Sequence, residues 1–296
     1  MVKSKSFIKY QAIINIALII ITLIMILPLV LLFMSSVSSE SSLLNNGYSF
    51  FPEKFSLNAY QYIMNNGRTI FQAYGVTVIV TVIGTLLNIS LSCMMAFALS
   101  VKKLPFRRII SFYVFFTMLF NGGLVPAYLM WTGTFHIKNT LFALIVPNFM
   151  LSAMNVMLIR SFFATSIPEA LYEAAQIDGA GYLRIFKNIV VPLGKPIVVT
   201  IGLFSGLTYW NDWTNGLYYI TKTQYLSIQT LLNRMIQDIQ AIQANASAAS
   251  NAAAIAIPAI SIRMAIAFVA LLPILVIYPF LQKYFANGIA LGAVKG

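Results

Sequence analysis

Cysteine and histidine are almost missing from this 296-residue sequence, which contains only Cys93 and His136. A single cysteine cannot form an intrachain disulfide. The two residues together are too few for a structural zinc site, and they leave little material for a Cys–His nucleophile pair. The sequence therefore argues against a membrane enzyme built on a cluster of nucleophiles, bases or metal ligands.

Charged residues are also scarce, at 9% of the chain, whereas an ordinary soluble domain has roughly 25%. Hydrophobic residues make up 59%, and the mean hydropathy is +0.84. Water could not solvate the surface that such a chain would expose, so much of the chain must lie in a bilayer. Few charges fall within the apolar runs, which argues against a proton- or sodium-coupled carrier or channel. The net charge of +12 comes from short basic clusters between those runs, a pattern typical of membrane topology and not of nucleic-acid binding.

Apolar runs of about 20 residues, enough for a helix to cross a bilayer, recur along the chain. They predict an all-α polytopic membrane protein with six transmembrane helices, at residues 12–34, 72–99, 109–131, 140–162, 197–220 and 258–282. Roughly two thirds of the Lys and Arg residues would lie on one side of this arrangement, which places both termini in the cytoplasm by the positive-inside rule. The residues on that side are Lys3, Lys5, Lys9, Lys102, Lys103, Arg107, Arg108, Arg160, Arg184, Lys187, Lys195, Lys283 and Lys295.

The cytoplasmic connection between the fourth and fifth predicted spans reads as a helix–turn–helix. Ser166 is a candidate N-cap, and Glu169 lies early in the first helix, where the helix dipole favours an anion. Gly179 and Gly181 would end this helix, and a second short helix would end near Pro192. One face of the first helix carries mainly small residues that could fit closely into a groove on a partner: Ala170, Ala174 and Ile177.

This segment resembles the EAA motif of importer-type ABC permeases, which reads Glu-Ala-Ala, three residues, Gly, nine residues, Ile, one residue, Leu-Pro. The matching positions are Glu173-Ala174-Ala175, Gly179, Ile189 and Val191-Pro192. Asp178 and Ala180 match the Asp-Gly-Ala form of sugar permeases, while Val191 departs mildly from the usual Leu. The alternative is a chance amphipathic loop.

The resemblance implies a type I ABC importer transmembrane domain over residues 1–296, with its core at about 72–282, a coupling segment at about 164–196 and a tail at about 283–296. In this family the motif forms a coupling helix that docks in a cleft of the ATPase subunit. Glu173 would then pair with a basic group of the ATPase, and Gly179 would make the turn. The full set of expected coupling residues is Glu173, Ala174, Ala175, Asp178, Gly179, Ile189 and Pro192.

The C-terminal end is similar to the tail of maltose-type carbohydrate permeases, in particular of the smaller of the paired subunits. That tail enters the interface of the ATPase dimer, which would assign a contact role to Gly292, Ala293, Val294, Lys295 and Gly296. A frayed polar terminus is the alternative.

An aromatic cluster near the outer end of the fifth predicted span is similar to clusters in related sugar permeases. Aromatic faces stack on sugar rings and Asn binds hydroxyls, so the expected pathway residues are Tyr209, Trp210, Asn211 and Trp213. An interfacial aromatic belt beside a capped helix end explains the same residues, and the sequence alone favours the belt. Polar residues elsewhere in the spans are expected mainly to form helix–helix hydrogen bonds, and they are Asn88, Asn121, Asn148 and Asn155.

The resemblance as a whole implies one permease subunit of an ATP-driven, binding-protein-dependent carbohydrate importer, near the subgroup for complex oligo- and polysaccharides. Its partners would be a second, homologous permease, two ATPase subunits and an extracytoplasmic sugar-binding protein. Its place would be the bacterial inner membrane. The chain lacks a phosphate-binding loop, because Gly194-Lys195-Pro196 has neither the upstream glycine nor the following Ser or Thr. ATP and Mg²⁺ are therefore expected on the partner ATPase.

Overall fold

The computed structural model describes residues 5–65, 67–147, 149–248 and 259–293, and within these ranges the chain is helical, with one isolated antiparallel bridge between Ser38 and Phe55. The all-α prediction is confirmed. The helices are α1 (Lys5–Ser36), α2 (Glu40–Asn46), α3 (Asn58–Asn65), α4 (Gly67–Ser100), α5 (Arg107–Leu119), α6 (Leu124–Leu129), α7 (Phe142–Ile145), α8 (Ala153–Ser166), α9 (Glu169–Ile177), α10 (Tyr182–Ile185), α11 (Val191–Leu193), α12 (Lys195–Trp210), α13 (Thr214–Tyr219), α14 (Ile228–Ala248) and α15 (Ala259–Ala293). Three short turns complete the set: the π-helical η1 (Met130–Thr134) and η2 (Phe186–Val190) and the 3₁₀ turn η3 (Thr223–Tyr225).

Internal contacts divide the chain into two compact units, Met1–Gly67 with Leu232–Ile274 and Arg68–Leu231 with Leu275–Gly296. In the first unit, the apolar run Tyr10–Ser36 of α1 has a mean hydropathy of 3.2 and is long enough to cross a bilayer, as predicted for residues 12–34. The Glu40 carboxylate accepts hydrogen bonds at 2.9 Å from the backbone N–H groups of Ile260 and Ser261. Glu40 therefore caps the N-terminus of α15.

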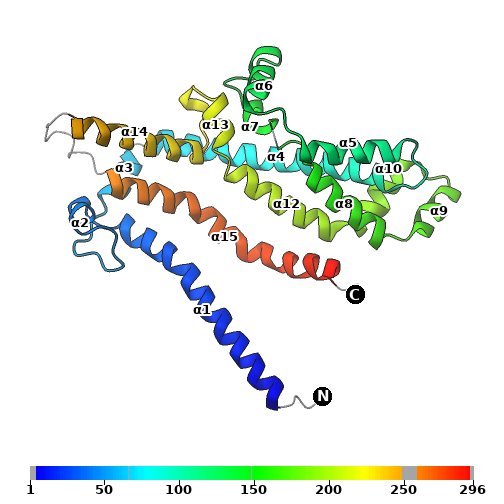
Figure 1. Cartoon of the computed structure of the whole chain (residues 1–296), viewed down its shortest axis with the longest axis horizontal. Coiled ribbons are helices and arrows are strands. Elements are labelled where there is room, and N and C mark those ends of the chain that lie inside the picture. Colours follow the sequence, from blue (N-terminus) through cyan, green and yellow to red (C-terminus); the bar gives the residue numbers. More distant parts are fainter. Residues whose placement is uncertain (1–4, 66, 148, 249–258, 294–296) are drawn as a thin grey trace. The chain divides into compact units, whose positions relative to one another are not determined.

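The second unit is built along α4, whose 34 residues confirm the predicted span at 72–99. Figure 1 shows α5, α8 and α12 running beside α4, with α9 and α10 at one end of these helices. The apolar core between them includes Ala96, Phe97, Ile159, Phe163 and Ile201, all buried. Burial of one face of each helix explains why these four elements pack together.

The third predicted span, 109–131, is not one continuous helix. Helix α5 ends at Leu119, and the segment Leu124–Thr134 leaves at an angle of 110° to it. Gly123 has φ +89°, a left-handed conformation that favours glycine, and its N–H donates to Asn121 Oδ1 at 2.8 Å. Asn121 was expected to form a hydrogen bond between helices, but the bond that the structure describes for its side chain lies within this local turn.

The fourth and fifth predicted spans are also interrupted. Within 140–162, α7 stops at Ile145 and helix resumes only at Ala153, where the Ser152 side chain caps α8. Within 197–220, α12 ends at Trp210, and Asp212 Oδ1 then accepts from Thr214 N at 3.0 Å and starts α13. In each case a side-chain oxygen accepts from a backbone N–H at the start of the helix that follows the break, a signal that hydropathy alone does not carry.

The described residues therefore contain two helices long and apolar enough to cross a membrane, or up to four if each bent pair is one span. The sixth predicted span, 258–282, lies in α15, whose apolar part is the shorter stretch Ile260–Val276. The count of six and the single-domain boundaries stay predictions.

Candidate functional site

The turn after α9 has a specific hydrogen-bond pattern. Ala180 N donates to Ala175 O at 2.9 Å and Gly179 N donates to Gln176 O at 3.0 Å. These two bonds form a Schellman motif, in which the residue after the cap takes a left-handed conformation. That residue is Gly179, with φ +77°. Asp178 is the cap itself.

The start of α9 differs from the prediction. Ser166 is the last residue of α8, and the N-cap of α9 is Pro168, which makes no side-chain capping bond. Ile167, between the two helices, is buried. The helix therefore begins where Pro168 sets the backbone and Ile167 anchors it in the core, with Glu169 in its first turn as expected.

Helix α9 is fixed to the bundle by Phe97, near the end of α4. The Phe97 ring lies 6.2 Å from the Tyr172 ring and 5.4 Å from the Phe186 ring, centroid to centroid. Burial raises the pKa of Tyr172, so the phenol stays neutral at physiological pH. One buried ring of α4 thus contacts both halves of the helix–turn–helix.

The opposite face of α9 is exposed. Ala170, Ala174 and Ile177 all lie on it, and Ile177 is 85% exposed. Together with Ala170 and Ala174, Ile177 leaves a small apolar face of α9 open to solvent. Ala175, by contrast, packs on the core beside Tyr172.

The second half of the segment continues as α10, η2 and α11. Ile189 packs on the core, whereas Pro192 is exposed. Gly194 follows, where a Cβ atom would lie 2.5 Å from Phe163 Cε1. Helix α12 then leaves at 81° to the segment before it, so glycine at 194 permits the close approach at this corner.

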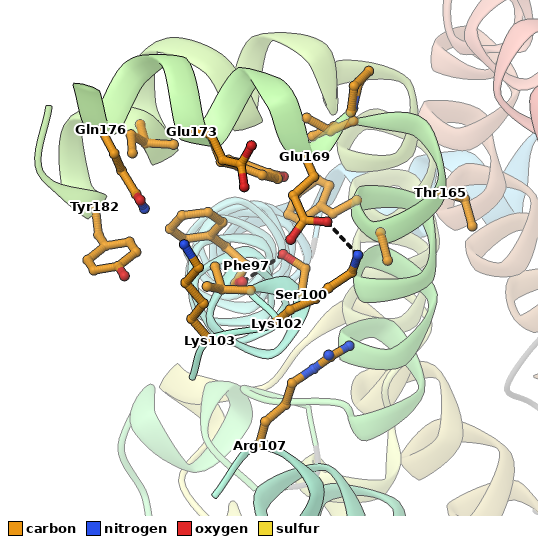
Figure 2. A pocket seen from close by; sticks show the side chains of 17 residues that line it. Phe97, Ser100, Lys102, Lys103, Arg107, Thr165, Glu169, Glu173, Gln176 and Tyr182 are labelled. Carbon is orange, nitrogen blue, oxygen red and sulfur yellow. Dashed lines mark hydrogen bonds and ion pairs between the residues drawn. The ribbon is translucent and has the colours of Figure 1, made fainter. Parts of the chain in front are cut away.

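A cleft of about 300 Å³ lies between α9 and the end of α4, and we name it the coupling cleft. Its charged lining residues are Lys102, Lys103, Arg107, Glu169 and Glu173. Lys102 and Glu169 form an ion pair, as Figure 2 shows, while Glu173 points into the cleft and has no ion pair among the described residues. The coupling cleft therefore presents one unpaired carboxylate beside unpaired basic groups.

Sequence reasoning missed Phe97, Tyr172 and the Lys102–Glu169 pair. Phe97 lies in an apolar run that has no local mark of a contact, and Lys102 is 67 residues from Glu169 along the chain. The described residues contain no group of three or more His, Cys, Asp or Glu side chains that could hold a metal ion.

The four residues of the aromatic cluster are placed differently from one another. Tyr209 is buried, donates from its hydroxyl to Ile145 O at 2.9 Å and packs edge-on against Phe149. Trp210 is also buried, whereas Asn211 and Trp213 are exposed. Of the tail residues, Gly292 and Ala293 end α15, and Val294, Lys295 and Gly296 lie outside the described residues.

The expected hydrogen bonding of polar residues within the spans is confirmed for three helices. Asn155 Nδ2 of α8 donates to Asn88 Oδ1 of α4 at 3.0 Å and to Ser205 Oγ of α12 at 3.2 Å. Ser205 Oγ donates in turn to Asn88 Oδ1 at 2.8 Å. This triad joins α4, α8 and α12 inside an apolar bundle; Asn148 lies outside the described residues.

Comparison with known protein families gives one match that covers most of the chain. The family described as "Binding-protein-dependent transport system inner membrane component" matches residues 88–291. This range contains the whole helix–turn–helix and its contacts on α4.

Two curated proteins of Bacillus subtilis (strain 168) are similar over most of their length. A polygalacturonan/rhamnogalacturonan transport system permease protein, YtcP, is 37% identical over 279 residues, which cover 94% of this chain and 96% of that protein. A melibiose/raffinose/stachyose import permease protein, MelC, is 31% identical over 222 residues, 74% of each chain. Among solved structures, a chain of a bacterial ABC transporter involved in the import of the acidic polysaccharide alginate superposes with a TM-score of 0.79 at 26% identity, covering 96% of this chain and 99% of the other.

Proposed function

The chain belongs to the family of binding-protein-dependent transport system inner membrane components, and from that membership we propose that it is the permease subunit of an ATP-driven carbohydrate importer. The cargoes of its relatives support a carbohydrate cargo: polygalacturonan and rhamnogalacturonan for one, melibiose, raffinose and stachyose for another, and alginate for the transporter of known structure. A permease of this family works with a partner permease, an ATPase and a substrate-binding protein. The assembly we propose has one homologous permease and two ATPase subunits, which hold ATP and Mg²⁺, with both termini of this chain in the cytoplasm.

The proposed coupling element is α9 with the turn that follows it. The observation that carries this proposal is the division of α9 into a fixed face, held by Phe97, and a free face with Ala170, Ala174 and Ile177. Docking of the free face in the ATPase would transmit movement through Phe97 into α4. Glu173 is the carboxylate available for a basic group of the ATPase, because no described residue of this chain forms an ion pair with it.

The test is the effect of Glu173→Gln on ATP hydrolysis by the assembled transporter with its loaded binding protein. We expect normal assembly and basal hydrolysis but a loss of substrate stimulation of about tenfold or more, since a charge-assisted hydrogen bond is worth roughly 1.5–3 kcal/mol. Glu53→Gln, which removes an exposed carboxylate outside the segment, is the matched control. Full stimulation in the Glu173 variant would rule out the coupling role. Transport by the chain with no ATPase present would support a secondary carrier instead.

Two further assignments belong to the same proposal. Residues 292–296 would contact the ATPase dimer, and deletion of them should weaken stimulated hydrolysis while membrane insertion stays normal. Asn211 and Trp213 are the members of the aromatic cluster with exposed side chains available to a sugar, and Tyr209 and Trp210 would support them from the core.

A further inference from the structure

A second cavity adjoins the coupling cleft at the end of α4. It has a volume of about 320 Å³, and we name it the apolar groove, because its walls are mostly aliphatic and aromatic carbon. The two cavities share four lining residues: Phe97, Val101, Lys103 and Tyr182. A charged cavity and an apolar one therefore meet along a common wall.

The apolar groove has exposed apolar side chains from two elements. Met94 of α4 is 51% exposed and Leu183 of α10 is 70% exposed. Phe97, buried at 7% exposure, is also part of the lining. Transfer of such side chains from water to contact with a hydrocarbon chain lowers the free energy.

The coupling cleft has an excess of basic groups that no carboxylate of the described residues balances. Lys102 is neutralised by Glu169, which leaves Lys103 and Arg107 against Glu173 alone. Lys103 lies on the shared wall, and Figure 2 shows its side chain rising into the coupling cleft.

Arg107 shares a hydrogen-bond acceptor with the guanidinium of Arg160. Arg107 Nε and Arg160 Nε both donate to the Leu99 carbonyl oxygen, at 2.8 and 3.2 Å, and neither arginine has an ion pair in the described part of the chain. The carbonyl satisfies one N–H of each group, and a guanidinium has five. The two positive charges lie close together, and each guanidinium keeps further N–H donors. Both features favour an anion beside the coupling cleft.

We propose that the coupling cleft and the apolar groove together bind one anionic phospholipid. Its phosphate lies between Lys103 and Arg107, and one of its acyl chains lies in the apolar groove between Met94 and Leu183. The occupant must be an amphiphile, since a free anion would leave the groove empty and a neutral lipid would leave the basic groups unpaired. Basic pockets at the cytoplasmic ends of membrane helices are suited to anionic headgroups.

The bound lipid contacts both the end of α4 and α10, so it stiffens the connection between the coupling segment and the bundle. This inference rests on the proposed function only for the side of the membrane and the effect on coupling. The lipid site itself is tested by binding, without substrate or ATP.

The experiment uses the complete transporter in nanodiscs of phosphatidylcholine mixed with phosphatidylglycerol, followed by native mass spectrometry of the lipid that stays bound after transfer to detergent. The wild type should retain phosphatidylglycerol over phosphatidylcholine. Lys103→Gln should lower that preference about fivefold, the effect of one basic residue near a charged headgroup. Leu183→Gln should lower retention of the lipid while keeping the preference, because it changes only the groove. Arg108→Gln removes an exposed neighbouring charge that lines neither cavity, and it should match the wild type.

Three results would overturn the inference. An equal loss in Arg108→Gln would mean a general attraction of surface charge and no site. Displacement of the retained lipid by inorganic phosphate would mean a free anion site. Retention unchanged in Lys103→Gln and Leu183→Gln would mean that the cavities hold no lipid. If retention behaves as expected but stimulated hydrolysis is independent of phosphatidylglycerol, the lipid site stands and its link to coupling fails.

Discussion

Replacement of Gly179 by alanine isolates the backbone cost of the turn between α9 and α10. Gly179 has φ +77°, and a Cβ atom built on it meets no atom within 4 Å. Alanine therefore adds no clash, and the change costs only the left-handed conformation, roughly 1–2 kcal/mol. A cost of that size shifts a folded-to-misfolded ratio by about 5- to 30-fold.

The equilibrium affected is the local one in which α9 keeps its Schellman turn and stays packed on Phe97. We expect Gly179→Ala to reduce the ratio of stimulated to basal ATP hydrolysis severalfold, with little change in expression or in thermal unfolding of the bundle. Gly179→Asn should recover part of this loss, since Asn tolerates the left-handed region better than Ala.

Gly181 is the matched control, because it also has open space around it but adopts φ −73°. Gly181→Ala should cost about 0.5 kcal/mol or less, through a slightly poorer N-cap of α10. The reasoning is refuted if Gly181→Ala is as damaging as Gly179→Ala, or if Asn at 179 does no better than Ala. Either result would mean that side-chain space at a partner surface, and not the turn, decides the effect.

Gly84→Ala would put a methyl group 2.5 Å from Cζ of the buried Tyr209 ring, so we expect thermal unfolding to show a free energy of unfolding lower by about 1–3 kcal/mol. Gly75→Ala should cause no such loss, because a Cβ atom at Gly75 meets nothing within 4 Å. Asn88→Leu should destabilise the bundle by about 1–3 kcal/mol because it leaves buried donors unpaired. A double-mutant cycle with Asn155→Leu should give a coupling free energy of about 0.6 kcal/mol. Full additivity of the two changes would contradict the hydrogen bond between Asn155 and Asn88. Lys102→Gln should change stability by less than about 1 kcal/mol, since its ion pair is solvent-screened, with the two side chains 70% and 46% exposed; a larger loss would show that the pair holds α9.

The helical class and the position of the coupling segment could be predicted from local signals. Apolar runs without alternation indicate helices in lipid, and the runs 12–34 and 72–99 are long enough to cross it. The turn at Gly179 was also predictable from a local signal, because a residue without Cβ adopts the left-handed conformation at little cost.

The interruptions of the other apolar runs could not be predicted from hydropathy. Asn121, Ser152 and Asp212 each accept a hydrogen bond from a backbone N–H two or three residues further along the chain, where the predicted spans are interrupted. Whether a polar residue in such a run caps a helix or joins two helices depends on what lies opposite it in space. Asn88 and Asn155 show the second outcome, since they meet across 67 residues of sequence.

By itself, the sequence determined that much of the chain lies in a bilayer, that a helix–turn–helix follows the fourth apolar run, and that this segment turns at Gly179. These properties follow from the transfer free energy of side chains and from the conformational range of single residues. Only the tertiary structure decided which face of α9 is held by Phe97, that Glu169 is paired while Glu173 has no ion pair with any described residue, and that a charged cleft meets an apolar groove at Lys103. Those facts depend on contacts between residues far apart in the chain, whose energies no local pattern encodes.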